Sequence, residues 1–281
     1  MNNILSRVWC KTFFVCALFS SNTSKAGIVD TTILLANNTT EHSIEITTRS
    51  IVKEANVIYP ETLQNNKEES LDYVQKFSGK KREYLIHTYQ KGKKFFPKIT
   101  AVLKRYHLPQ ELKVLVALES GFNANAVSGA GAVGYWQIMD EVAKEYGLQI
   151  LDQSVVADPK NKKKDDRTNF SKSTLAAAKY LHDRCKNFNN DLLLMVASYN
   201  CGAGNVKNAM RKTGKSTPGF WDIKKYLPAE TRAYVMNFIA LNVVFENYDK
   251  FLKNKLTFNS EIIEVPVVPE NPVNIIPVII D

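Results

Sequence analysis

Apolar residues recur at helical spacing through most of this 281-residue chain, from about residue 68 to residue 250. Prolines stand where first turns are expected and glycines where helices should end, which is the usual asymmetry of helix boundaries. The pattern predicts helices over residues 68–77, 80–91, 95–106, 109–120, 141–146, 171–187, 191–199, 203–212 and 228–250. Such a series of helices, with no repeat apparent, predicts an all-α domain.

One acidic residue lies on the apolar side of its own predicted helix. Leu112, Leu115 and Val116 stand seven, four and three positions before Glu119, so all four side chains share one face of the helix over 109–120. Burial disfavours the charged form of a carboxyl group, and this suits a general acid. A carboxyl group in such a position is either paired with a cation or catalytic.

A glycine-rich loop follows this acid directly. Residues 121–139 contain Gly121, Gly129, Gly131 and Gly134. Glycine lets the backbone take turns that other residues avoid and lets it approach a ligand closely. The sequence therefore predicts that this loop lies beside a ligand near Glu119.

The first 26 residues have the features of a secretory signal peptide. Arg7 and Lys11 precede a short apolar run, and Ser24-Lys25-Ala26 offers small residues at the −3 and −1 positions of a cleavage site. The run is too short to span a bilayer, although an uncleaved anchor is the alternative. Cys16 lies in the run, but the Phe-Phe-Val before it disfavours lipidation. We therefore expect an exported protein in the periplasm or cell envelope of a bacterium.

Four segments follow from these patterns. We expect a signal peptide over 1–26, a poorly ordered or weakly extended leader over 27–66, a helical catalytic domain over 67–256 and a Pro-rich extended tail over 257–281. The leader is rich in Asn and Thr without helical periodicity. The tail contains four prolines among Val and Ile, so it is no regular helix. We leave open whether it docks on the domain, on other cell-wall enzymes or on a membrane.

The formal charge is moderately basic. Removal of residues 1–26 takes away Arg7, Lys11 and Lys25 and no acid, so +9 becomes 9 − 3 = +6. Clusters over 76–98 and 160–164 hold many of the lysines, and solvated helix faces account for most of them. No phosphate loop and no nucleic-acid motif accompanies them, so nucleic acid is not an expected partner. An exported basic protein is instead attracted to anionic polymers or membrane surfaces.

Neither the histidines nor the cysteines predict a metal site, and no cofactor is expected. The four histidines show no paired ligand spacing. After removal of the signal peptide, Cys185 and Cys201 remain in a compartment that permits disulfides. On two antiparallel helices joined near Asn189 they are offset by roughly 10 Å, which exceeds the reach of a disulfide. We expect both thiols to be free.

Four sequence blocks occur in a fixed order in the helical region: Glu119-Ser-Gly-Phe-Asn, then Ser128-Gly-Ala-Gly-Ala-Val-Gly-Tyr-Trp-Gln-Ile-Met, then Ala197-Ser-Tyr-Asn-Cys-Gly-Ala-Gly, then Glu230-Thr-Arg-Ala-Tyr-Val. Together they resemble the lytic murein transglycosylases of glycoside hydrolase family 23, nearest the membrane-bound D type. The resemblance covers about residues 70–248. It implies a goose-type-lysozyme-like α fold and peptidoglycan glycan strands as substrate.

The resemblance places the family's acid on Glu119. It implies that this residue protonates the oxygen between N-acetylmuramic acid and N-acetylglucosamine and then takes a proton from the sugar's C6 hydroxyl. Ser128, Gln137 and Tyr199 are suited to orienting the acid and an acetamido group by hydrogen bonds. The full set of substrate-binding or acid-orienting residues expected around Glu119 is Ser128, Gln137, Tyr199, Tyr234, Met139, Tyr135 and Glu230.

Three of these assignments keep an alternative. Met139 and Tyr135 provide either an apolar wall for the sugar or ordinary core packing. Glu230 either binds sugar or holds its motif together with Arg232, and we favour the second. The sequence departs from the family in reading Tyr135 where Leu is usual and Cys201 where a small residue is usual. The LysM repeats often found in this type do not follow, which puts processive or septum-targeted binding in doubt.

Three other interpretations remain. Glu119 is a structural acid paired with Arg105 or Arg232, or the chain is a hydrolytic lysozyme, or it is a non-catalytic peptidoglycan-binding protein. Lysozymes of the inverting and retaining kinds hold a second carboxyl group ~6.5–9.5 Å or ~5–5.5 Å from the acid. Only Asp140, Glu141 and Asp166 are near enough in the sequence to be candidates, and none matches a catalytic position of the family.

Overall fold

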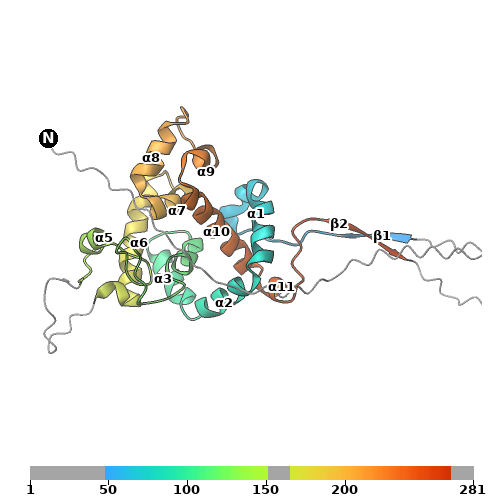
Figure 1. Ribbon diagram of the computed structural model, residues 1–281, viewed down its shortest axis with the longest axis horizontal. Helices are drawn as coiled ribbons and strands as arrows, with labels where there is room; N and C mark the ends of the chain where they lie inside the picture. Colours follow the sequence, from blue (N-terminus) through green and yellow to red (C-terminus); the bar gives the residue numbers. More distant parts are fainter. Residues whose placement is uncertain (1–47, 151–164, 267–281) are drawn as a thin grey trace, which may run out of the picture. The chain divides into compact units, whose positions relative to one another are not determined.

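The computed structural model describes residues 48–150 and 165–266, which fall into two compact units. A helical unit extends over residues 57–258, with residues 151–164 left out, and a separate β-ribbon holds the two strands (Figure 1). Two regions of the prediction, the signal peptide over 1–26 and the leader up to residue 47, lie outside the described residues. The two strands are β1 (Thr48–Lys53) and β2 (Glu261–Pro266).

The helical unit consists of α-helices joined by short 3₁₀ turns, so the all-α prediction is confirmed for it. The α-helices are α1 (Lys67–Lys80), α2 (Arg82–Gly92), α3 (Phe96–Arg105), α4 (Leu115–Ser120), α5 (Asp140–Glu145), α6 (Phe170–Asn187), α7 (Leu192–Cys201), α8 (Ala203–Arg211), α9 (Phe220–Ile223), α10 (Ala229–Glu246) and α11 (Tyr248–Leu252). The 3₁₀ turns are η1 (Glu61–Asn66), η2 (Gln110–Val114), η3 (Asp166–Thr168) and η4 (Lys224–Tyr226).

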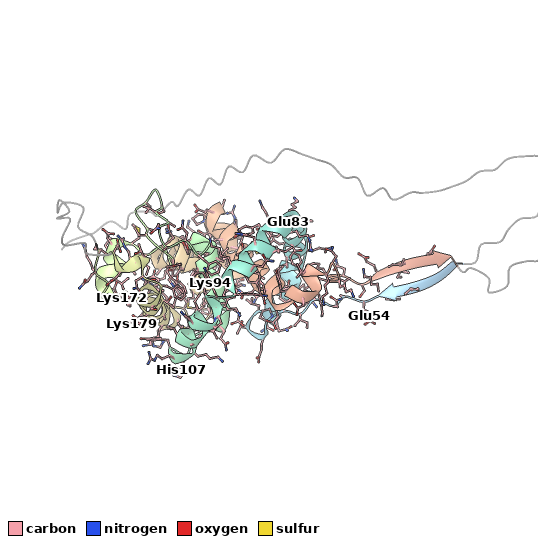
Figure 2. The ribbon with its side chains drawn as sticks, turned by 90° about the horizontal axis from the view of Figure 1, so that it is seen from below. Glu54, Glu83, Lys94, His107, Lys172 and Lys179 are labelled. Atoms are coloured by element: carbon pink, nitrogen blue, oxygen red, sulfur yellow. The ribbon has the colours of Figure 1, made fainter. Side chains whose placement is uncertain are left out.

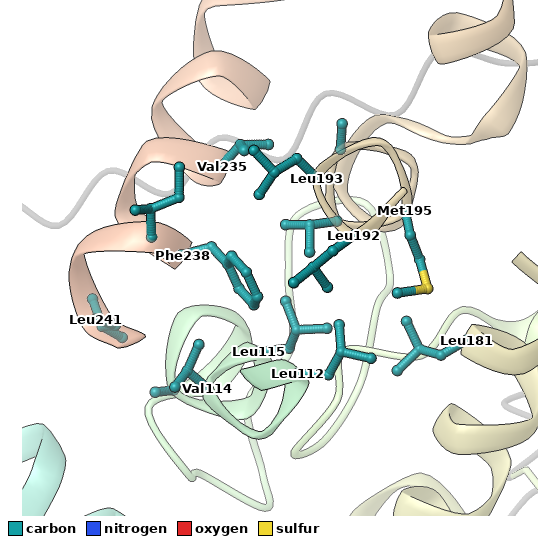
Figure 3. Packing of buried hydrophobic residues seen from close by; sticks show 14 of the residues in the cluster. Leu112, Val114, Leu115, Leu181, Leu192, Leu193, Met195, Val235, Phe238 and Leu241 are labelled. Carbon is teal, nitrogen blue, oxygen red and sulfur yellow. The ribbon is translucent and has the colours of Figure 1, made fainter. Parts of the chain in front are cut away.

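Helices α7 and α10 form the centre of the core. Nearly every residue of α7 is buried, because its Leu192-Leu-Leu-Met-Val-Ala run is apolar all round. Helix α10 packs against α1, α4 and α7, and its own buried residues include Val235 and Phe238. Figure 3 shows these side chains meeting Leu112 and Leu115 from the segment that leads to Glu119. The acid is therefore carried by a short helix seated against the most buried part of the unit.

Local sequence signals set several helix ends. The side chains of Asn169 and Asp191 accept hydrogen bonds from backbone N–H groups in the first turns of α6 and α7. Gly121 ends α4 with a φ of 55°, in the left-handed region that glycine adopts without strain. These ends agree closely with the predicted ranges because capping depends on residues near in sequence.

The helical unit begins earlier than the sequence analysis predicts. Tyr59 and Leu63 are buried in the core, and the Tyr59 hydroxyl lies 3.1 Å from the hydroxyl of Ser70. Ile58 exchanges hydrogen bonds with the side chain of Asn247, from its N–H at 2.9 Å and to its carbonyl at 2.6 Å. The predicted boundary at residue 67 is therefore too late in the chain. The apolar residues of the segment before residue 67 have no regular spacing. This segment is therefore ordered only by its tertiary contacts.

The two strands pair as an antiparallel ribbon. Residues 48–53 of the predicted leader face residues 261–266 of the predicted tail, with Ile51 opposite Ile263 and Val52 opposite Ile262. All four of these side chains are exposed. The part of the tail beyond residue 266 lies outside the described residues.

Several lysines lie on solvated surfaces, as the sequence predicts. Lys172 and Lys179 of α6, and Lys94 in the turn between α2 and α3, are exposed and project from the surface of the helical unit (Figure 2). Cys185 and Cys201 are both free thiols, as predicted. Among the described residues, no helix combines the length and the apolar character needed to cross a membrane.

Candidate active site

Glu119 lies in the last turn of α4 with only 2% of its surface exposed. The Tyr234 hydroxyl of α10 donates a hydrogen bond to Glu119 Oε1 at 2.8 Å. In the structural alternative, Glu119 forms an ion pair with Arg105 or Arg232. Of these, Arg232 donates to the carbonyl of Leu227 at 2.8 Å, and Arg105 is exposed at the end of α3. The structure thus gives the buried carboxyl group a neutral hydroxyl donor.

Three tyrosines surround this carboxyl group. Burial raises the pKa of Tyr199 and Tyr234 well above the usual range, and the nearby charge of Glu119 raises both further. Burial also raises the pKa of Tyr180, to which Glu119 adds a smaller amount. The rings of Tyr180 and Tyr199 meet edge to face with centroids 5.7 Å apart. All three hydroxyl groups therefore remain protonated.

The tyrosines are held in place by ties between elements. Tyr199 Oη donates to the carbonyl of Trp136 at 2.6 Å, which links α7 to the glycine-rich loop. Thr231 Oγ1 donates to Asn200 Oδ1 at 2.8 Å, which links the start of α10 to the end of α7. Helix ends and loop are thereby fixed around one carboxyl group.

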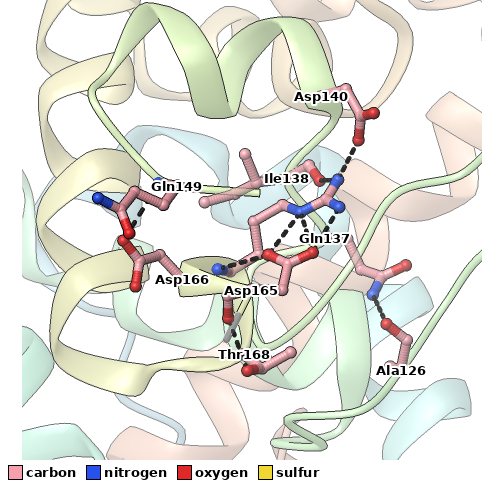
Figure 4. A network of polar contacts seen from close by, with 9 residues as sticks. Ala126, Gln137, Ile138, Asp140, Gln149, Asp165, Asp166 and Thr168 are labelled. Atoms are coloured by element: carbon pink, nitrogen blue, oxygen red, sulfur yellow. Dashed lines mark hydrogen bonds and ion pairs between the residues drawn. The ribbon is translucent and has the colours of Figure 1, made fainter. Parts of the chain in front are cut away.

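Gln137, in the glycine-rich loop, has a strained backbone and a buried side chain. Its backbone has a φ of 48°, which is uncommon for a residue other than glycine. Its Nε2 donates to the carbonyl of Ala126 (Figure 4) and to that of Gly134, each at 3.0 Å. The buried Oε1 has no hydrogen-bond partner among the described residues. A buried acceptor without a donor is costly, and strain of this kind clusters at functional sites.

Among the four glycines of the loop, Gly134 is the one at which close packing leaves no room for a side chain. A Cβ at this position would come within 2.1 Å of the carbonyl oxygen of Arg167, and the φ of Gly134 is 81°. The loop therefore lies directly on the segment around η3. The glycines predict a loop that lies beside a ligand, whereas at Gly134 the close approach is to the protein's own backbone.

A small pocket opens beside Tyr180 and Tyr199, two tyrosines whose pKa the charge of Glu119 affects. It is lined by residues of the loop, of α5, of α6 and of α7: Gln137, Ile138, Met139, Val142, Ala177, Tyr180 and Tyr199. Three residues expected from the sequence, Gln137, Met139 and Tyr199, thus face one pocket. Tyr180 was not expected. Its position in the 171–187 helix follows the ordinary helical period, so no local signal distinguishes it.

The remaining expected residues lie elsewhere. Ser128 is half-buried, and its Oγ accepts a hydrogen bond from the N–H of Ala132 within the loop. Tyr135 packs in an aromatic cluster with Phe95 and Phe170, at centroid distances of 5.6 and 5.2 Å. Core packing, one of the two roles predicted for Tyr135, therefore describes its contacts. Glu230 is exposed in the first turn of α10.

A buried arginine fixes the far side of the loop. Arg167 donates to both carboxylate oxygens of Asp165, to the carbonyl of Ile138 at 3.3 Å and to Asp140 (Figure 4). Burial alone would lower the pKa of this guanidinium, but Asp165 and Asp140 outweigh burial and raise it. The cluster attaches η3 to the residues that follow Gln137, so it supports the pocket without lining it.

Two of the three candidates for a second catalytic carboxylate are engaged in ion pairs. Asp140 pairs with Arg167, and Asp166 pairs with Lys172 at 2.7 Å. Asp166 also accepts from the N–H of Gln149 at 3.1 Å, and its pKa is lowered chiefly by the hydrogen bond from Lys172. Glu141 is exposed in the first turn of α5. Among the described residues, no group of His, Cys, Asp and Glu has the arrangement of a metal site.

Comparison with known proteins finds similarity over part of this chain. Residues 97–219 match the family described as "Transglycosylase SLT domain". The membrane-bound lytic murein transglycosylase D of Escherichia coli (strain K12) is 33% identical over 173 residues, which cover 60% of this chain and 35% of that protein. A putative tributyltin chloride resistance protein of Alteromonas sp. (strain M-1) is 32% identical over 127 residues, which cover 45% of this chain and 56% of that protein. The chain thus spans about a third of the length of the first of these relatives.

Solved structures of lytic transglycosylases overlap with part of the chain. An inactive mutant of lytic transglycosylase Slt from Pseudomonas aeruginosa has a TM-score of 0.44 at 22% identity, covering 55% of this chain and 24% of that one. A 70-kDa soluble lytic transglycosylase in complex with bulgecin A has a TM-score of 0.43 at 22% identity, covering 69% of this chain and 30% of that one. The match to the family includes Glu119, the glycine-rich loop and Tyr199. Residues 97–219 of this chain are thus similar to a transglycosylase SLT domain.

Proposed function

We propose that this protein is an exported peptidoglycan lytic transglycosylase that cleaves the bond between N-acetylmuramic acid and N-acetylglucosamine. The observation that carries the proposal is Glu119, a buried carboxyl group bonded to the Tyr234 hydroxyl and adjoining the pocket of Gln137 and Tyr199. The SLT domain and the 33% identity to a lytic murein transglycosylase support the same reaction.

In the proposed reaction Glu119 first acts as an acid. Its proton passes to the glycosidic oxygen as the bond from that oxygen to C1 of the muramic acid breaks, and the N-acetylglucosamine end leaves with a new hydroxyl group. The carboxylate formed then takes the proton of the muramic acid's C6 hydroxyl while the C6 oxygen bonds to C1. The acid is regenerated and no water is consumed, so the product is a 1,6-anhydro sugar.

Two features of the site favour this sequence of steps. The hydroxyl of Tyr234 donates to Glu119 and stabilises the carboxylate that forms between the steps. The unpartnered Oε1 of Gln137 offers an acceptor to an N–H of the substrate, for which the sugar's acetamido group is suited. The C6 hydroxyl is tethered to the reacting sugar, so its effective concentration is high relative to that of water.

The alternative enzyme is a hydrolytic lysozyme, which needs a carboxylate to activate water. The ion pairs of Asp140 and Asp166 speak against either in that role. A third alternative, a peptidoglycan-binding protein without activity, has no specific observation in its favour.

Analysis of the released muropeptides tests the proposal. Purified protein is incubated with peptidoglycan in ¹⁸O-labelled water, and products are identified by mass. We expect 1,6-anhydro-N-acetylmuramic acid ends, lighter by one water than hydrolytic products and without label. Reducing ends that carry ¹⁸O would instead establish a lysozyme, and an absence of soluble products would support the binding protein.

Export is the part of the proposal that concerns residues 1–26. We infer cleavage after Ala26 and action in the periplasm or cell envelope, on the basis of the apolar run and the Ser24-Lys25-Ala26 site. Mass analysis of the protein isolated from cells should give a chain that begins at or near Gly27. An acyl group on Cys16 would show an anchored protein instead.

A further inference from the structure

A second, larger pocket lies on the other side of α10 from the acid. It has a volume of about 780 Å³ and is bordered by the end of α8, by α9, by η4 and by the start of α10. Four of its lining residues are cations, namely Lys215, Lys224, Lys225 and Arg232, and only one, Asp222, is an acid. We call it the cationic pocket.

Its single acid is already neutralised. Asp222 pairs with Lys215 and accepts a hydrogen bond from the N–H of Gly219 at 3.0 Å. These contacts hold the start of α9 and lower the pKa of Asp222, with Lys215 as the main cause. The remaining three cations therefore have no second carboxylate among the lining residues of the pocket.

Lys224 shows most clearly the consequence of the excess of positive charge in the pocket. Its Nζ lies 4.6 Å from the centre of the Trp221 ring and 3.5 Å from the sulfur of Met236. Burial lowers the pKa of its amine, and the positive charge of Arg232 lowers it further. Two cations held close together in a partly buried place favour an added anion.

Aromatic side chains hold the cations in position. Trp221 is fixed by the hydrogen bond from its Nε1 to Asn66 Oδ1 at 2.8 Å, and it carries Lys224 on its face. Lys225 Nζ lies 5.0 Å from the centre of the exposed Tyr226 ring. Arg232 uses Nη1 to donate to Leu227, and a guanidinium has five N–H donors in all. The pocket therefore presents donors whose positions are set before a ligand arrives.

Helix α10 connects the cationic pocket to the acid. Arg232 lines the pocket and Tyr234, two residues later, donates to Glu119. Residues two apart differ by ~3 Å along a helix axis and point to nearly opposite sides of a helix ~10–12 Å wide. The anion site thus lies on the order of 10–15 Å from the reacting bond.

We propose that the cationic pocket binds the carboxylates of the stem peptide that peptidoglycan carries on its muramic acid. This inference rests on the proposed function, because it takes peptidoglycan to be the substrate. The stem peptide begins at the reacting sugar and ends in free carboxylates.

The test compares glycan strands that carry stem peptides with strands stripped of them by an amidase. The variant is Lys224→Gln with Lys225→Gln, and the matched control is Lys98→Gln with Lys104→Gln, which removes the same charge from the exposed face of α3. We expect the variant to lose about tenfold in kcat/KM on stem-bearing strands and to change by less than about twofold on stripped strands. The control should change by less than about twofold on both.

Equal losses of the variant and the control would indicate general attraction to an anionic wall and overturn the proposal. So would a variant that loses as much on stripped strands as on stem-bearing ones. Should the double variant fail to fold, Lys225→Gln alone, at an exposed position, gives the same comparison with a smaller expected loss.

A binding measurement separates this inference from the proposed function. Calorimetry with a free stem tetrapeptide and the Glu119→Gln protein needs no catalysis, and we expect heat of binding that Lys224→Gln with Lys225→Gln removes. If wild-type protein cleaves neither kind of strand, the proposed function fails while this readout still decides on the pocket. Equal binding of inorganic phosphate and of the peptide would show a general anion site, and the proposal would be wrong.

Discussion

Arg167 and Lys224 are both cations held partly or wholly away from water, yet their surroundings are opposite. Arg167 has two carboxylates and a backbone carbonyl as acceptors, and its pKa is raised. Lys224 faces an indole ring, a thioether and a second cation, and its pKa is lowered. The two residues lie in different regions of one helical unit, beside the glycine-rich loop and beside α9.

The difference separates a structural role from a binding role. A cation whose charge is matched by fixed acids holds the backbone around it, and removal of the cation leaves those acids unpaired. A cation without a fixed counter-ion weakens the fold slightly and is suited to a ligand that brings the missing charge. Arg167 thus supports the loop at the candidate active site, and Lys224 lines the pocket proposed to bind the stem peptide.

The largest effect should come from substitution of Glu119, the proposed catalytic acid. Glu119→Gln keeps the shape of the side chain but removes the proton and the carboxylate, so we expect glycan cleavage to fall by about 10³-fold or more. Both regions should persist, since neither contacts the acid directly. Turnover is measured by release of soluble muropeptides, and thermal unfolding checks the fold. Cleavage at the wild-type rate would remove Glu119 from the mechanism.

The next effect sharpens the structural half of the comparison. Arg167→Met leaves Asp165 and the Ile138 carbonyl without their donor in a buried place, so the free energy of unfolding should fall by about 3–5 kcal/mol. Lys76→Met is the control, because its pair with Asp72 is exposed and contributes less than about 1 kcal/mol. Urea titration measures both. A loss for Arg167→Met no larger than that of the control would mean that the Asp165 cluster is not structural.

A smaller effect distinguishes the tyrosines at the acid. Tyr234→Phe removes the donor to Glu119, which stabilises the carboxylate formed during the proposed reaction, so we expect kcat to fall by about 10- to 100-fold. Tyr199→Phe instead removes a tie to the Trp136 carbonyl, so its loss in kcat should be smaller, at about tenfold or less. Steady-state kinetics on glycan strands measure both. A loss for Tyr234→Phe no larger than that for Tyr199→Phe would place its role in packing.

Much of the helical unit could be predicted because its signals are local. The predicted helices over 171–187, 191–199 and 203–212 agree with α6, α7 and α8 to within a few residues at each end. The burial of Glu119 followed from its spacing to Leu112 and Leu115, and it is confirmed. In each case the period of apolar residues, or a capping residue next to it, carries the information.

The parts that could not be predicted depend on contacts between distant residues. Tyr59 and Leu63 are ordered by packing, and the neighbouring Ile58 exchanges hydrogen bonds with Asn247, which stands almost at the other end of the unit. Tyr180 reaches the active site because α6 passes α7 there, and nothing near it in sequence indicates this. In the sequence, Lys224 looks like an ordinary lysine of a lysine-rich surface. Only the fold shows that its neighbours are Trp221 and Arg232, neither of which balances its positive charge.

The smallest effect tests the other half of the comparison, at Lys224. A cation held without a counter-ion costs the fold free energy, so Lys224→Met should leave the free energy of unfolding unchanged or raise it by no more than about 1 kcal/mol, since the side chain is half-exposed. Its lowered pKa gives the sign of the pH dependence. The unfolded chain holds this proton more tightly than the folded one, so the cost is present at neutral pH and declines as pH rises through the folded pKa toward 10.5. The gain of Lys224→Met over wild type should therefore shrink between pH 7 and pH 10, as measured by urea titration at each pH. A clear loss of stability at neutral pH would show that Lys224 has a structural partner, and the contrast with Arg167 would no longer hold.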